Sequence, residues 1–328
     1  IANYADMFYQ FNGANQVTSI TSQGNGCSVC TGGLGTTTFD YTISNNGDGV
    51  NSWTYKRVED LPGFDSSSST NAQNGQVITY SNYLGEPILT VTVQNATGLE
   101  TIDYYKYDND GEQILHVAPS GVLGYNESYP GLVVFGSNSF LSQHSGLFEW
   151  TGYSSGYVVD TGVSQGYSGT FQELTSTDYT YITDDYDVIH TEIYSTSTYA
   201  SSGDTRTTYY DYTFTDNTAS SVAYVSMIET TAPSVSSGQN GPGDSAVSYT
   251  VMDQYGRMIW TKDADGFIDY TAYDPKTGAV VETITDVNTN LTGEFSNLPT
   301  GWVSPSTVSS LNLITTYQVD DQGRTVQT

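Results

Sequence analysis

The chain is 328 residues long and carries 36 acidic residues against 8 Lys and Arg, for a formal net charge of −28. A chain this acidic is repelled by nucleic acid and by anionic membrane surfaces, and no apolar run approaches the roughly 20 residues of a membrane helix. Charged and aromatic residues each make up 13% of the chain, whereas a disordered acidic segment would be poor in aromatic residues. The composition therefore predicts folded β-structure with a sizeable core.

The first repeat-like part spans residues 4–43 and contains a short hairpin motif, FNGANQVTSI, that begins at Phe11. The only two cysteines, Cys27 and Cys30, follow in a Gly-rich loop. A structural zinc site needs four ligands, and a thioredoxin-like site needs the start of a helix; the sequence offers neither. We expect a small disulfide that pins a turn, with free thiols or a metal shared between subunits as open alternatives.

The second repeat-like part spans residues 76–117. Alternating apolar and polar residues in ILTVTV, at positions 88–93, predict a half-buried strand. The sequence YDNDGEQI from Tyr107 places Asp108 at the head of a turn and Gly111 at its tip. An Asp side chain accepts hydrogen bonds from backbone N–H groups in such a turn, and Gly takes a positive φ without steric cost.

Residues 118–246 depart from this pattern. They are rich in Gly, Ser and Tyr, and the Pro- and Gly-containing stretch 230–245 is the clearest break. We expect an irregular part rich in insertions, although YYDYTF at positions 209–214 alternates like a strand. No segment of the chain shows the apolar spacing of an amphipathic helix.

The third repeat-like part, residues 247–328, gives the clearest signal. It contains two copies of one hairpin motif between Val251 and Asp286, and a further copy begins at Val319. Each copy has an Asp before the turn, a Gly at the tip, and branched or aromatic strand residues behind it. The expected turn residues are Asp253 with Gly256, Asp265 with Gly266, Asp274 with Gly278, and Asp320 with Gly323.

The motif Tyr-Asp-x-x-Gly-Arg followed by apolar strand residues resembles the repeat of the Rhs or YD-repeat family, closely over residues 247–328 and loosely over the rest. Proteins of that family are large secreted or surface polypeptides whose hairpins spiral into a hollow β-shell. The resemblance implies an all-β fold: an array of antiparallel β-hairpins forming a spiral sheet or shell segment, with almost no helix. Residues 1–328 would be one continuous array, cut from a longer chain.

The resemblance also implies a function. We expect a non-enzymatic, extracellular or cell-surface scaffold that needs no cofactor and serves as part of a shell wall or as a surface-interaction segment. Its partners would be further repeats of the parent chain or identical copies, because the end strands of a hairpin array must be paired, capped or used for assembly.

Three other interpretations stay open. Trp53 and Trp302 lie near irregular segments and could present flat rings to cell-surface glycans. Glycoside hydrolysis is less favoured; it needs two carboxyl groups a few ångströms apart, and candidates such as Glu149 and Glu173 cannot be paired from sequence. The acidic turns at Asp108 and Asp263 suggest calcium, but neither fits an EF-hand loop, so we expect no specific metal site.

Overall fold

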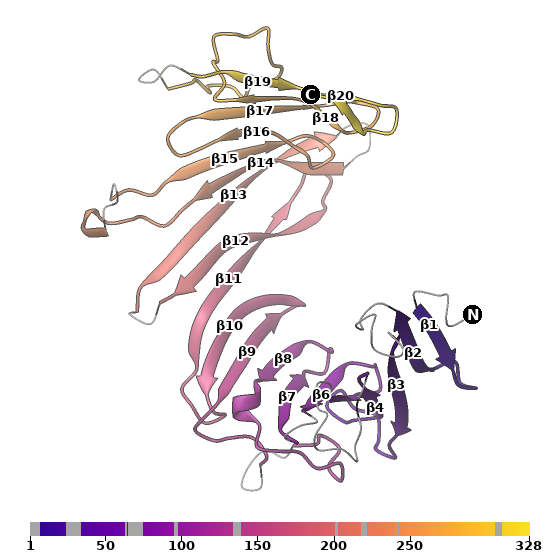
Figure 1. The fold of residues 1–328 in the computed structure, drawn as a ribbon. Helices are drawn as coiled ribbons and strands as arrows, with labels where there is room; N and C mark the ends of the chain where they lie inside the picture. Colours follow the sequence, from indigo (N-terminus) through magenta and orange to yellow (C-terminus); the bar gives the residue numbers. More distant parts are fainter. Residues whose placement is uncertain are drawn as a thin grey trace. The chain divides into compact units, whose positions relative to one another are not determined.

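The fold consists of β-strands joined by turns and loops (Figure 1). The computed structural model describes residues 7–23, 34–62, 64, 75–94, 98–133, 139–200, 203–217, 222–239, 241, 243–305 and 310–328. Among these residues the only helical segments are two 3-10 turns of three residues each, and no helix is long and apolar enough to cross a membrane. The predicted all-β array of antiparallel hairpins is confirmed.

The chain divides into two compact units, and the first comprises residues 1–174. Each strand of its described part pairs antiparallel with the next strand in the sequence. The strands are β1 (Met7–Phe11), β2 (Val17–Gln23), β3 (Leu34–Ile43), β4 (Tyr55–Asp60), β5 (Gln76–Ser81), β6 (Pro87–Val93), β7 (Glu100–Tyr107), β8 (Gln113–Val117), β9 (Leu147–Ser154) and β10 (Tyr157–Gln165).

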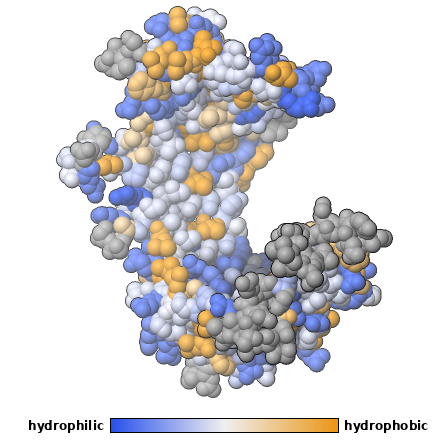
Figure 2. All heavy atoms as spheres, in the orientation of Figure 1, coloured by the Kyte–Doolittle hydropathy of each residue, from blue (hydrophilic) through white to orange (hydrophobic). Residues whose placement is uncertain are grey.

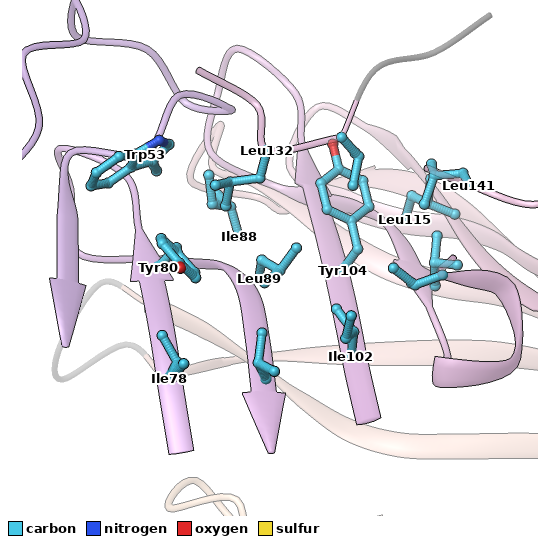
Figure 3. Close-up of a cluster of buried hydrophobic side chains, with 14 of the residues drawn as sticks. Trp53, Ile78, Tyr80, Ile88, Leu89, Ile102, Tyr104, Leu115, Leu132 and Leu141 are labelled. Carbon is cyan, nitrogen blue, oxygen red and sulfur yellow. The ribbon is translucent and has the colours of Figure 1, made fainter. Parts of the chain in front are cut away.

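The core of the first unit lies on one face of β5 to β9. Alternation along each strand brings apolar side chains into cross-strand rows, such as Tyr80, Leu89, Tyr104, Val117 and Phe148. The loop between β8 and β9 lies over this face and contributes buried side chains of its own: Val122, Leu132, Val133 and Leu141. Figure 3 shows Leu132 of this loop above Ile88 and Leu89 of the sheet.

The second unit comprises residues 175–328. Its strands also pair with the next in sequence from β11 to β19, while β20 and β21 form a separate hairpin. The strands are β11 (Gln172–Thr183), β12 (Ile189–Tyr199), β13 (Thr205–Asn217), β14 (Val222–Thr231), β15 (Val247–Met252), β16 (Met258–Lys262), β17 (Ile268–Tyr273), β18 (Val280–Thr285), β19 (Leu313–Thr316), β20 (Gln318–Val319) and β21 (Thr325–Gln327).

A smaller core lies on one face of β16 to β18. Trp260, Ile268 and Ile284 are almost fully buried there. The chain after β18 packs against them, as the loop after β8 does in the first unit, and supplies Phe295, Leu298 and Trp302. Each unit therefore covers one apolar sheet face with an irregular loop.

In the part of the sequence that separates these two cores, the structure differs from the irregular part expected over residues 118–246. The described residues among 118–146 and 232–246 are largely irregular, but β9 to β14 fill much of residues 147–231. The strand indicated by residues 209–214 is present within β13, but the irregular structure expected around it was wrong. Strands such as β11 and β12 carry Thr, Ser and Tyr on both faces, which hides the apolar alternation. The surface over β11 to β14 is accordingly mostly pale in Figure 2, with scattered apolar patches.

Candidate functional site

The turn between β15 and β16 defines the structural motif of the chain. The Asp253 amide donates to the Arg257 carbonyl at 2.9 Å, and the Gly256 amide donates to the Asp253 carbonyl at 3.0 Å. Asp253 Oδ1 also accepts from the amides of Tyr255 at 2.9 Å and Arg257 at 3.0 Å. Gly256 has a φ of +74°. This is a three-residue hairpin loop closed by a residue in the left-handed region, in which the Asp side chain holds the backbone.

The same hydrogen bonds recur at Asp108 with Gly111 and at Asp320 with Gly323. They also occur at three places with other residue types: Asn12 with Asn15, Asn82 with Gly85, and Asp184 with Asp187. Sequence reasoning missed the last two. Asn accepts these bonds as Asp does, and Asp187 adopts a φ of +61° at the position that Gly256 occupies in the turn between β15 and β16. A pattern of Asp or Asn followed three residues later by Gly, Asn or Asp would have found them.

Two of the expected turns differ in detail. In the turn between β16 and β17 the acceptor is Asp263, whose Oδ1 binds the Phe267 amide at 2.8 Å, while Asp265 lies inside the loop. Gly266 closes this turn with a φ of +89°. The turn at Asp274 is one residue longer, because the Asp274 amide reaches the Ala279 carbonyl at 2.8 Å; Gly278 again has a positive φ, of +74°.

Arg257 connects its turn to the neighbouring hairpin through side-chain contacts. Its guanidinium donates to Asp253 Oδ2 at 2.8 and 2.6 Å and lies 4.9 Å from the Tyr255 ring centre and 4.5 Å from that of Tyr273. Burial raises the pKa of Asp253, but the hydrogen bonds from Arg257 and from the backbone outweigh it and lower the pKa overall. The Arg of the motif thus joins two hairpins by a charge-assisted pair and two ring contacts.

Trp53 does not form an exposed glycan platform, and this expectation is wrong. Its side chain is only 6% exposed and packs edge-on against the Tyr80 ring at 5.6 Å. Its Nε1 donates to the Glu127 carbonyl at 3.2 Å, and the Glu127 carboxylate accepts from Lys56 Nζ at 2.6 Å and Tyr80 Oη at 2.7 Å. Trp53 is therefore part of the contact that holds the covering loop on the first sheet.

Trp302 is half-buried in the smaller core of the second unit. Its ring lies 5.9 Å from that of Tyr249, and Lys262 Nζ lies 5.8 Å from the Trp302 ring centre and 6.0 Å from the Tyr249 ring centre. The ammonium group occupies ring surface that a sugar would need for stacking. The geometry at Trp302 favours packing over glycan recognition.

The remaining candidates from the sequence are the two cysteines and the acidic turns considered for calcium. Cys27 and Cys30 lie outside the described residues. In the described part of the chain no group of three or more His, Cys, Asp and Glu is arranged to hold a metal ion. At Asp108 and Asp263 the carboxylates accept backbone N–H groups, which explains their presence in the turns.

The carboxylates considered for glycoside hydrolysis belong to different elements. Glu149 on β9 lies 2.6 Å from His116 Nδ1, and Asp103 lies 2.9 Å from His116 Nε2, with His116 stacked on Tyr105 at 4.8 Å. Glu173 lies on β11. Of the buried acidic residues described, Asp184 belongs to the β11–β12 turn and bonds His190, while Asp286 follows β18.

Two strands leave an edge and apolar side chains uncovered in the described structure. β1 pairs with β2 alone, and its Met7, Tyr9 and Phe11 point to one face with 57%, 44% and 60% of their surface exposed. β19 pairs with β18 alone, and Leu313 and Ile314 are 56% and 44% exposed. Such edges carry unpaired backbone groups that can accept another strand.

Comparison with known proteins gives little beyond this geometry. No protein-family model matches the sequence, and no curated protein matches it. The crystal structures titled TcdB2-TccC3-Cdc42 and TcdB2-TccC3-TEV align with 99% and 97% of this chain, at 9% and 10% identity and TM-scores of 0.35 and 0.34. The chain spans 16% and 17% of the length of those chains.

Proposed function

We propose that the protein is a non-enzymatic, extracellular structural scaffold of the Rhs or YD-repeat type, serving as a wall or surface-interaction segment of a larger assembly. The single observation that supports this most is the recurrence of one turn geometry, with an Asp or Asn side chain holding the backbone and a residue of positive φ closing the loop. A chain that repeats one hairpin unit builds extended sheet and offers no recurring catalytic group.

The charge of the chain supports a location outside the cell. With 8 Lys and Arg in 328 residues, it offers few cleavage sites to trypsin-like proteases. A net charge of −28 also keeps an extended β-surface soluble by self-repulsion. These are the properties required of an exposed scaffold.

The uncovered edges suggest how the scaffold associates. We infer that β1 and β19 pair with further hairpins of the parent chain or with identical copies, because each combines an open edge with exposed apolar side chains. Lys on an edge strand is a known device against such pairing. A Lys at Phe11 or Ile314 should therefore interrupt assembly without disturbing a core, since both side chains are exposed.

The experiment is sedimentation velocity over a range of protein concentrations at about 0.15 M salt, where the Debye length of about 8 Å limits repulsion between copies. The native chain should associate as concentration rises, and Phe11→Lys combined with Ile314→Lys should remain monomeric. Ala14→Lys combined with Gln322→Lys adds the same charge at exposed positions of two turns and should associate like the native chain. A native chain that stays monomeric throughout, with no larger assembly in electron micrographs of the parent protein, would refute the proposal.

A further inference from the structure

A small hollow with aromatic walls opens beside β9 and β10 in the first unit. Its volume is about 390 Å³, within the range of sites that hold small molecules. Its lining is mostly apolar. The residues that matter for its chemistry are Trp150, Gly152, Asp160, Ser164, Tyr167 and Phe171.

Two glycines shape the hollow. In the β9–β10 ladder Gly162 pairs with Trp150, and Gly152 pairs with Asp160. A Cβ atom at Gly162 would collide with the Phe171 ring, and a Cβ atom at Gly152 would collide with the Asp160 carboxylate. The absence of both side chains therefore lets an aromatic ring and a carboxylate lie close against the sheet.

Most polar groups around the hollow already have partners. Trp150 Nε1 donates to Ser164 Oγ at 2.9 Å, and Ser164 Oγ donates to the Gly166 carbonyl at 3.0 Å. Tyr167 Oη accepts from Gln143 Nε2 at 2.6 Å. The Asp160 carboxylate, in contrast, has no hydrogen bond and no ion pair among the described residues, although its residue is half-buried. It is the one charged group among the residues that line the hollow, and it is available to a ligand.

We propose that this hollow binds an alkylammonium group, with the ammonium between Asp160 and the aromatic faces and the alkyl stem against Trp150 and Phe171. Aromatic faces attract cations, and the attraction is larger where water is partly excluded. The net charge of −28 raises the local concentration of cations around the whole protein.

Other ligand classes fit less well. A neutral sugar needs several hydrogen bonds, but Trp150, Ser164 and Tyr167 direct theirs to the protein. A divalent metal ion needs several oxygen ligands, and no such cluster exists among the described residues. One unpaired carboxylate in an aromatic hollow matches a single organic positive charge.

The test follows the indole ¹H–¹⁵N resonances, of which the chain has four, with Trp150→Phe used to assign that of Trp150. Titration with n-butylammonium chloride at constant ionic strength should shift the Trp150 signal alone and saturate with a dissociation constant of about 1–10 mM. n-Butanol should give no saturable shift. A lysine tripeptide with blocked ends tests whether the hollow also binds the alkylammonium group of a lysine side chain. If the tripeptide binds as tightly as n-butylammonium, lysine side chains of a peptide are ligands. If it binds more weakly, the ligand is a free amine.

Asp160→Asn should weaken n-butylammonium binding by about tenfold, because it removes the charge but keeps the shape. Asp265→Asn, in an exposed turn of the second unit, removes the same charge from the protein and should leave the affinity unchanged. Equal weakening in both variants would mean diffuse attraction and would overturn the proposal. So would the absence of a saturable shift up to about 50 mM, well above the dissociation constants of weak cation–aromatic sites, or saturable binding of methyl glucoside that survives Asp160→Asn.

Discussion

The strands β5 to β9 and the strands β11 to β14 have the same antiparallel pairing but are stabilised by different side-chain interactions. In β5 to β9 one face is apolar, and the loop after β8 covers it, so that Tyr80, Leu89 and Phe148 have no exposed surface. In β11 to β14, Ala223 is the only buried hydrophobic residue described, and the other buried residues are polar, such as Ser195 and Ser197. The longer strands thus rely on backbone ladders and hydroxyl contacts instead of a covered core.

Side-chain hydroxyl groups form hydrogen bonds between neighbouring strands in β11 to β14. Ser195 Oγ donates to Asp178 Oδ2 at 2.9 Å, and Ser197 Oγ lies 2.8 Å from Thr207 Oγ1. Each such hydrogen bond contributes only about 1 kcal/mol net, since water offers similar partners in the unfolded chain. Hairpin turns and backbone ladders can therefore extend a sheet far beyond the part that a hydrophobic core supports.

The largest expected effect comes from truncating the covered core. Leu89→Ala should lower the free energy of unfolding of the first unit by about 2–5 kcal/mol, because Leu89 is fully buried and a cavity remains. Ile193→Ala on β12 removes similar apolar surface from a side chain that is 37% exposed and should cost less than about 1 kcal/mol. Urea denaturation, monitored by hydrogen exchange in each unit, measures the loss in the free energy of unfolding for both variants. Equal losses would contradict the distinction between covered and uncovered strands.

The sequence predicted the covered strands well and the uncovered strands poorly, for a physical reason. Apolar alternation in residues 88–93 is a local signal, so β6 could be read from it. The burial of Trp53 could not, because it depends on contacts to Pro130 and Glu127, more than 70 residues away. Turn residues such as Asp253 and Gly256 were found because their hydrogen bonds span only four residues.

The candidate ligand hollow was also beyond sequence reasoning. It depends on the register between β9 and β10, which shifts at a bulge between Val158 and Asp160. Without that shift Asp160 would not lie opposite Gly152. Alternation places Glu149 and Trp150 on opposite faces of β9, so the neighbouring carboxylate considered from sequence is not the one in the hollow.

Substitutions in the turns, which connect covered and uncovered strands alike, are expected to cause an intermediate loss of stability. Gly256→Ala should lower the free energy of unfolding by about 1–2 kcal/mol, because Gly256 has a φ of +74° and the cost comes from the backbone alone. Gly13→Ala is the matched control: no atom lies within 4 Å of its added Cβ and its φ is not in the left-handed region, so a gain of about 0.4–1 kcal/mol is expected. Thermal melts of both variants test the turn assignment, and a stabilised Gly256→Ala would refute it.

The smallest expected effect concerns charge on the uncovered strands. The pKa of Asp216, an exposed residue at the end of β13, is raised by local desolvation of its carboxylate and by the neighbouring Asp185 and Asp184. A carboxylate whose pKa is higher in the folded than in the unfolded protein destabilises the fold while it is ionised, and this penalty disappears below the unfolded pKa of about 4. Asp216→Asn should therefore stabilise the protein at neutral pH, and the gain should fade as the pH drops towards 4.

Asp265→Asn makes the same change in net charge in an exposed turn of the second unit, so the difference between the two variants isolates the local repulsion at Asp216. Asp184 acts in the opposite direction, because hydrogen bonds from His190 and from the backbone lower its pKa despite burial, and its stabilising contribution is lost only at acid pH. Urea midpoints between pH 3.5 and 7 should consequently show the gain of Asp216→Asn over Asp265→Asn at neutral pH and none at the acid end. A gain that is constant over this range would mean that Asp216 acts through packing and not through its charge.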